Sequence, residues 1–308
     1  SEGFSVFDGD RFTNYRTNEG LALNYVSAII ESHRSPGTMW IGTLGGGISN
    51  FADGRFRTIQ LDSLVSANQI VELVEDRSGV VWCGTAWGLY TLRENHASRV
   101  FIDEKDQHIG GVAEIADGNL CVGIGPSLAI LSSTSALRYT IHLSRYCKGR
   151  SQSILAETDT TFWVCTTDGY ILHFRDTLLL EQRATEFKGL NSISDDGNGS
   201  LWICSESGLL RIEKRTISIA RFICYTTENG LPDNRVEACM FDRENNLWIG
   251  GIGQGLSKLA DRSIMSFRLN PPPMGSLYHP AAAQDSHNHI WAISSDGLWE
   301  FWMERDGH

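Results

Sequence analysis

The sequence predicts an all-β fold assembled from seven repeats, and three observations support this prediction. A short motif, clearest as NLWIGG at 246–251, recurs along the chain at intervals of 39 to 46 residues. A glycine follows most copies by six or seven residues, with Ser127 in that place in the third copy. Repeats of this length are typical of a seven-bladed β-propeller with four antiparallel strands per blade. The blade cores are expected near Trp40, Trp82, Cys121, Trp163, Trp202, Trp248 and Trp291.

Length and charge narrow the class of protein. The chain has 308 residues, or 44 for each of seven repeats, and a single repeat cannot bury its faces alone. We therefore expect residues 1–308 to form one propeller. The net charge of −11 argues against a nucleic acid partner, which needs concentrated Lys and Arg. No apolar run approaches the ~18 residues of a membrane span, so direct membrane insertion by this segment is not expected either.

The second repeat shows the expected order of strands within a blade. Residues 70–74 are apolar except for Glu72 and predict the innermost strand, followed by a turn at 75–79 and a strand at 81–85. A loop at 86–88 then leads to strands at 89–92 and 99–102. Asp76 and Gly79 explain the turn, because aspartate can accept hydrogen bonds from the backbone ahead of it and glycine adopts positive φ. The same spacing recurs at 196–199 and, with asparagine for glycine, at 242–245 and 285–288.

The two ends of the chain are expected to share one blade. Residues 3–7 and 11–16 read as short strands around an Asp-Gly turn, ahead of the first full repeat. The last repeat reaches only three strands before the chain stops. We therefore predict that an N-terminal strand, 11–16, completes the last blade by pairing with 298–302, and that 3–7 is displaced. Such closure would protect the edges of the sheet.

The repeats resemble those of a known family. EDRSGVVWCGT at 75–85 and NGLPDNRV at 229–236 are similar to the two-component regulator propeller repeat. The resemblance covers essentially the whole chain and is weakest in the third and fourth repeats. Members are typically periplasmic ectodomains of bacterial hybrid sensor kinases, and many are proposed to sense polysaccharide fragments. The resemblance therefore implies a periplasmic input domain with further receptor domains as partners, while a cytoplasmic location stays open.

No catalytic, metal or cofactor motif is visible. The seven cysteines form no Cys-x-x-Cys pair, and the four in or beside the repeated motif are interpreted as small buried hydrophobes rather than redox groups. His287 and His289 are the one close histidine pair and fall in a turn, where a solvated side chain is the commoner interpretation. Carboxylate pairs at Glu75-Asp76 and Asp195-Asp196 are explained by the repeated turn. We expect no catalytic residues, no metal and no cofactor.

Antiparallel topology predicts where a ligand would bind. The start of the first strand and the end of the second lie at the same end of a blade, so their loops share one face around the central channel. Trp87 breaks the pattern there and could stack on a sugar ring, or simply pack within its loop. The asparagines could instead cap their loops through their side chains. The candidate ligand-binding residues are Asn24, Tyr25, Asn68, Trp87, Asp168, Glu206, Asn234, Arg235, Tyr278 and His279.

Three functions remain open on the sequence. The first is a ligand-sensing propeller of a two-component receptor, recognising a small molecule or oligosaccharide. The second is a propeller used only for protein interaction or for homodimer formation. The third is a propeller enzyme, either a lyase or a glycan-active protein. A cluster of histidine and carboxylates at the channel would favour the enzyme, and a large apolar surface patch would favour the interaction module.

Overall fold

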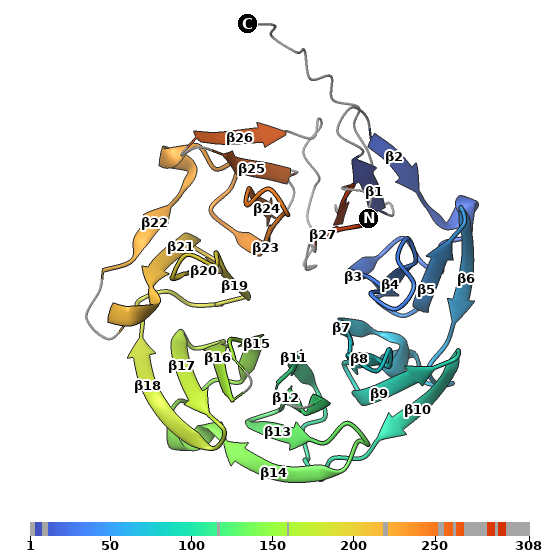
Figure 1. The fold of residues 1–308 in the computed structure, drawn as a ribbon, viewed down its shortest axis with the longest axis horizontal. Helices are drawn as coiled ribbons and strands as arrows, with labels where there is room; N and C mark the ends of the chain where they lie inside the picture. Colours follow the sequence, from blue (N-terminus) through green and yellow to red (C-terminus); the bar gives the residue numbers. More distant parts are fainter. Residues whose placement is uncertain are drawn as a thin grey trace, which may run out of the picture.

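The chain folds into a ring of antiparallel sheets (Figure 1). The computed structural model describes residues 4–7, 12–115, 118–158, 160–217, 221–251, 256–260, 263–267, 282–286 and 289–293. Within these ranges the strands form seven four-stranded sheets, each stacked against the next around a central axis. The described segments contain no helix long and apolar enough to cross a membrane.

Six of these sheets use four strands that are consecutive in sequence, and we number them as blades one to six. Blade one contains β3 (Val26–Glu31), β4 (Met39–Thr43), β5 (Gly47–Ala52) and β6 (Arg55–Ile59). Blade two contains β7 (Ile70–Glu75), β8 (Val81–Thr85), β9 (Gly88–Arg93) and β10 (His96–Val100). Blade three contains β11 (Ile109–Glu114), β12 (Leu120–Ile124), β13 (Ser127–Leu131) and β14 (Leu137–His142).

The remaining consecutive blades follow the same order, with the first strand innermost. Blade four contains β15 (Ser151–Ala156), β16 (Thr161–Thr166), β17 (Tyr170–Arg175) and β18 (Leu178–Ala184). Blade five contains β19 (Ser192–Asp195), β20 (Ser200–Ser205), β21 (Gly208–Glu213) and β22 (Ile223–Tyr225). Blade six contains β23 (Val236–Phe241), β24 (Leu247–Gly251), β25 (Leu256–Ala260) and β26 (Ser263–Phe267). Short 3-10 turns connect several strands: η1 (Thr17–Glu19), η2 (Val65–Asn68), η4 (Leu143–Arg145), η5 (Lys214–Thr216) and η6 (Thr227–Asn229).

The last sheet is composite and corrects the predicted fold class. It is ordered β27 (Ala282–Gln284), β28 (Ile290–Ile293), β1 (Phe4–Phe7) and β2 (Phe12–Tyr15). Six blades, not seven, are therefore built from a continuous stretch of chain, and two N-terminal strands rather than one complete the ring. The predicted pairing of 11–16 with 298–302 is wrong, since β2 pairs with β1 and β1 pairs with β28. Residues 298–302 lie outside the described part.

Packing of Phe4 explains why 4–7 is not displaced. Phe4 is 1% exposed and stacks on Trp291, with 5.3 Å between ring centroids, and on Tyr15 at 5.2 Å. The sequence interpretation expected residues 3–7 to be displaced from this blade. In the structure β1 itself occupies the third position of the sheet, so its aromatic side chain is buried between strands from both chain ends.

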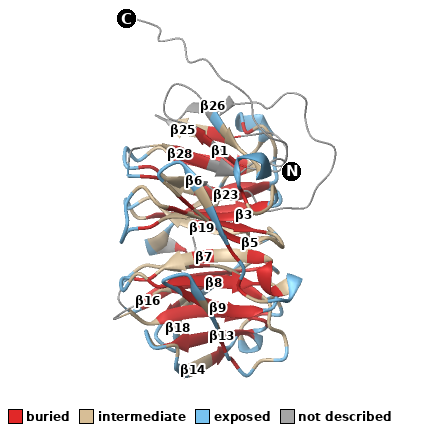
Figure 2. Cartoon of the chain, turned by 90° about the vertical axis from the view of Figure 1, so that its right-hand side faces the viewer, coloured by how far each residue is buried: buried red, intermediate tan, exposed pale blue. Residues whose placement is uncertain are grey.

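The repeated motif is explained by burial and by contacts between blades. Every residue of the second strand is buried in blades two to five, whereas most residues of the outermost strands are exposed or half-buried (Figure 2). The Trp82 indole donates to Asp76 Oδ2 at 2.7 Å, across the predicted turn. The glycine two residues after the tryptophan gives room to the next blade: a Cβ on Gly84 would lie 2.7 Å from Ile109 Cγ2.

The cysteines are structural, as the sequence interpretation proposed for those in the motif. All seven are free thiols, and all except the half-buried Cys224 are buried. Cys165 and Cys204 occupy the place that glycine takes in blades one to three. Burial raises the pKa of the Cys83, Cys121 and Cys165 thiols far above its ordinary value, so they stay protonated at neutral pH.

Candidate functional site

The predicted loops lie together at one end of the central channel. In blades one and two, Leu44 and Gln69 form an isolated antiparallel bridge, and the Ala86 N–H donates to the Gln69 carbonyl at 3.1 Å. The residue before an innermost strand therefore contacts two second strands at their ends: the one in its own blade and the one in the preceding blade. We call this end of the ring the loop face.

The three asparagines of the loop face are engaged in holding their own loops. Asn24 Oδ1 accepts the Thr17 N–H at 2.8 Å, and Asn234 Oδ1 accepts the Thr227 N–H at the same distance. Asn68 is 3% exposed, and its amide binds the backbone of residues 61, 62 and 64. In each case the side-chain amide oxygen accepts a backbone N–H, so all three asparagines cap their own loops, which is one of the two roles that the sequence left open.

Among the described tryptophans, Trp87 is the one that is exposed to solvent. Its side chain is 45% exposed, whereas that of Trp82, five residues earlier, is fully buried. The Trp87 backbone is fixed on both sides: its N–H donates to Thr85 Oγ1 at 3.0 Å and its carbonyl accepts from Arg99 at 3.3 Å. Tyr25, at the start of blade one, is 38% exposed on the same face. A rigid loop thus presents an indole to solvent.

Charged candidates occupy the loop face further round the ring. Asp168 accepts the Thr166 hydroxyl at 2.7 Å and the Lys148 N–H at 2.9 Å, and these bonds hold its pKa below the ordinary value although burial opposes this. Glu206 is exposed, and Arg235 lies 3.9 Å from the buried Glu237 carboxylate. Tyr278 and His279 lie outside the described residues.

The channel wall is built from residues that the sequence interpretation missed. In five blades the innermost strand shifts register by one residue at the same place, just after it begins. Each extra residue forms a β-bulge, a device that re-aims a side chain. The bulged residues are Ser27, Val71, Gly110, Gln152 and Glu237, and all line one central cavity of about 330 Å³. The signal in the sequence is weak: a mixture of polar and small residues at the second position of apolar strands.

The cavity is also lined by carboxylate, imidazole and amide side chains. Glu72, His108 and Glu237 line it together with Gln152 and Asn191. The Glu237 side chain is only 5% exposed, so the channel holds a buried carboxylate near the loop face. Among the described residues no group of three or more His, Cys, Asp or Glu is placed to hold a metal ion. The arrangement offers hydrogen-bond donors and acceptors to a small polar ligand.

These features define a β-propeller whose loop face and central cavity form the candidate site. The chain carries a two-component regulator propeller repeat, since the model of that family matches residues 230–253. This match confirms the resemblance drawn from the repeats. A comparison with curated protein sequences found no relative.

Solved structures share the fold. The extracellular domain of a hybrid two-component system from B. thetaiotaomicron is similar with a TM-score of 0.73 and 20% identity, over 88% of this chain and 39% of that one. The chain therefore spans well under half the length of that relative. A streptogramin B lyase matches with a TM-score of 0.70 and 16% identity, over 87% of this chain and 92% of that one. A virginiamycin B lyase from Staphylococcus aureus with quinupristin matches with a TM-score of 0.71 and 14% identity, over 90% of this chain and 96% of that one.

Proposed function

We propose that this propeller is the sensory input domain of a two-component receptor and that it recognises a carbohydrate at its loop face. The regulator propeller repeat and the likeness to an extracellular two-component domain support the receptor assignment. A periplasmic location and further receptor domains are part of the same proposal. The position of the gene tests it: the reading frame should continue into a membrane helix and a kinase.

The observation that carries the ligand proposal is the exposed, rigidly held Trp87. Its backbone is fixed by Thr85 and Arg99, so little ordering entropy is lost when a ligand packs on the indole. A sugar ring presents C–H groups to such a flat surface and hydroxyls to polar neighbours. Gln107 accepts a hydrogen bond from Arg99, the side chain that also holds the Trp87 carbonyl.

Calorimetric titration with a panel of oligosaccharides tests this role. Trp87→Ala should abolish binding, because the platform is lost, and should leave the melting temperature within a few degrees of the parent. Trp87→Phe should retain part of the affinity. A large loss of stability in Trp87→Ala would show that the indole is a core element, and the proposal fails if no member of the panel binds the parent protein.

A second candidate is a protein-interaction module, favoured by a specific observation. Beside Trp87, the loop face of blades one and two exposes Leu64 at 49%, Val65 at 68% and Phe101 at 83%. Exposed apolar side chains gathered on one face of a protein often mark a docking site. Val65→Ser with Phe101→Ser should then weaken self-association or partner binding without changing oligosaccharide binding.

We propose further that the propeller does not turn over its ligand. Glu72, His108 and Glu237 line the central cavity, and they are the channel groups that argue for acid–base chemistry. Incubation of purified protein with the same oligosaccharides, followed by chromatography, should show no cleavage. Cleavage that disappears in Glu237→Gln would instead assign the propeller to the enzymes.

A further inference from the structure

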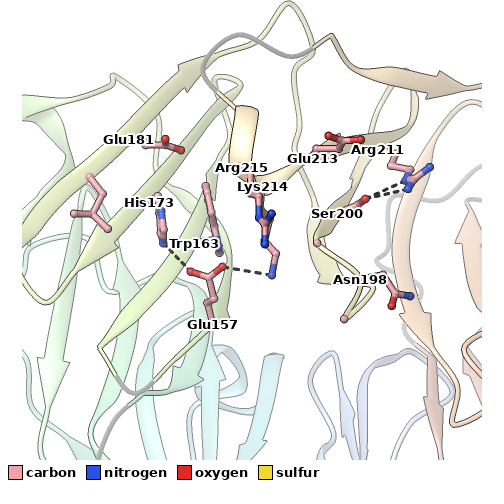
Figure 3. Close-up of a pocket in the computed structure, with 13 residues that line it drawn as sticks. Glu157, Trp163, His173, Glu181, Asn198, Ser200, Arg211, Glu213, Lys214 and Arg215 are labelled. Atoms are coloured by element: carbon pink, nitrogen blue, oxygen red, sulfur yellow. Dashed lines mark hydrogen bonds and ion pairs between the residues drawn. The ribbon is translucent and has the colours of Figure 1, made fainter.

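A large pocket opens between blades four and five, away from the loop face. Its volume is about 1040 Å³, at the upper end of the range of ligand-binding cavities. The wall on the side of blade four is formed by β16, β17 and β18, and the other by the turn at 197–199, β21 and η5 (Figure 3). Nine of the lining side chains are charged or polar, among them Glu157, His173 and Lys214 (Figure 3).

The pocket lies where a repeated link between blades is replaced. At three other junctions, an acceptor at the end of one innermost strand receives an N–H from the turn of the preceding blade. Glu75 accepts the His33 N–H at 2.7 Å, and Glu114 accepts the Arg77 N–H at 3.0 Å. Asp195, the corresponding residue of blade five, instead binds Lys214 Nζ at 2.7 Å. The Asp195 carboxylate therefore pairs with a residue of its own blade rather than with the turn of blade four.

The inner wall departs from the repeat in a second way. Glu157 stands where blades two, five and six have the aspartate of the Asp–Trp pair. Its carboxylate meets His173 Nε2 at 2.9 Å and Lys214 Nζ at 3.4 Å. The His173 ring stacks on the buried Trp163 indole, with 3.8 Å between centroids and 8° between planes. One face of the imidazole is therefore covered by the core.

The protonation states of this wall are set by its contacts. Burial opposes ionisation of Glu157, but the Trp163 indole, His173, Thr161 and Lys214 together hold its pKa below the ordinary value. Burial lowers the pKa of His173 despite the nearby Glu157. Asp195 and Glu157 raise the pKa of Lys214 although burial opposes this. At neutral pH the wall thus presents a carboxylate, a neutral imidazole and an ammonium.

The rim carries charges of both signs that have no partner within the described residues. Glu181 projects from β18, Glu213 ends β21 and Arg215 lies on η5. All three line the pocket, and among the described residues none of their side chains makes a hydrogen bond or ion pair, although the charge of Glu181 acts on His173. A ligand with one charge would gain from one of these groups and be repelled by another. A ligand carrying both charges can pair with each.

We propose that this pocket binds a small zwitterion, a molecule with a free amine and a free carboxylate such as an amino acid or a dipeptide. Its ammonium group pairs with Glu181 and its carboxylate with Arg215. The body of the ligand lies toward His173 and Leu180 on the blade-four wall. This site is separate from the loop face, so the proposal goes beyond carbohydrate recognition by Trp87.

Titration of the full chain with amino acids and dipeptides tests the proposal. N-acetylated and C-amidated forms of each binding compound should bind about tenfold more weakly or worse, because each lacks one charge. Glu181→Gln and Arg215→Gln should each cause a loss of similar size. Arg138→Gln, an exposed change on β14 outside the pocket, is the matched control and should leave the affinity unchanged.

Several outcomes overturn the proposal. It is wrong if no zwitterion of the panel binds at about 10 mM, if the blocked forms bind as well as the free ones, or if neutral oligosaccharides bind here with sensitivity to Arg215→Gln. Trp87→Ala should retain zwitterion binding. If Trp87→Ala loses oligosaccharide binding but keeps zwitterion binding, the two sites are separate. Melting temperatures confirm that each variant is folded.

Discussion

At the scale of single residues, the pairing of aspartate with tryptophan accounts for the repeat. Asp76 Oδ2 accepts the Trp82 indole N–H, while Oδ1 accepts the Ser78 and Val80 N–H groups at 2.9 and 3.0 Å. One carboxylate thus ties the turn to the core of the blade. Asp196, Asp242 and Asp285 bind Trp202, Trp248 and Trp291 in the same way.

Replacing Asp76 with alanine should therefore destabilise the fold strongly. Asp76→Ala leaves the buried Trp82 indole N–H without its acceptor, which costs about 2–3 kcal/mol of unfolding free energy. Urea denaturation measures the loss. The exposed Asp103→Ala is the control and should change the unfolding free energy by less than about 0.5 kcal/mol. Equal effects of the two substitutions would show that the pairing contributes little.

The same carboxylates predict how stability depends on pH. Burial would raise the pKa of Asp76, Asp196 and Asp242, but hydrogen bonds from the turns and the indoles lower it below the ordinary value. A group with a lowered folded-state pKa stabilises the fold above its unfolded pKa and loses this effect as the pH falls through the folded value. The urea midpoint should be level from about pH 7 to 5 and fall below about pH 4. The decline should be shallower in Asp76→Asn, and a midpoint that rises on acidification would contradict this account.

At the scale of elements, the glycine of the second strand allows neighbouring blades to pack. A Cβ on Gly123 of β12 would collide with Ser151 Oγ at the start of blade four. Gly123→Ala should lower the unfolding free energy by about 1–3 kcal/mol through overpacking. Ser151→Ala in the same chain should recover part of this loss, because it removes the colliding oxygen. Additive effects in the double-mutant cycle would show that the two residues do not interact.

Sequence periodicity predicted most of the strands but less of the candidate site. Tryptophan spacing located the second strand of each blade, because that strand is buried on both faces. The channel side chains depend on bulges at Ser27, Gln152 and Glu237, and the residue types at these positions follow no regular pattern. Likewise, Lys214 reaches Glu157 from the next blade, a contact between residues 57 positions apart. Spacing within one repeat cannot reveal such pairs.

At the scale of the whole molecule, the two ends of the chain form one sheet, and this closes the ring. Each Cα of β1 has a partner in both β28 and β2, so removing the N-terminal strands would expose an edge of β28. The edge would lack its ladder of hydrogen bonds, each worth about 1 kcal/mol net, and could template association. The loop face and both pockets depend on blades held in this closed arrangement.

The most direct test of this closure is thermal unfolding, with the oligomeric state, of a chain lacking residues 1–16. Its control is a chain lacking only residues 1–3, which keeps β1 and β2. The account predicts a sharply lower unfolding midpoint and self-association for the longer deletion, with the shorter deletion close to the parent. A longer deletion that melts like the parent and remains monomeric would contradict the closure of the ring by both ends of the chain.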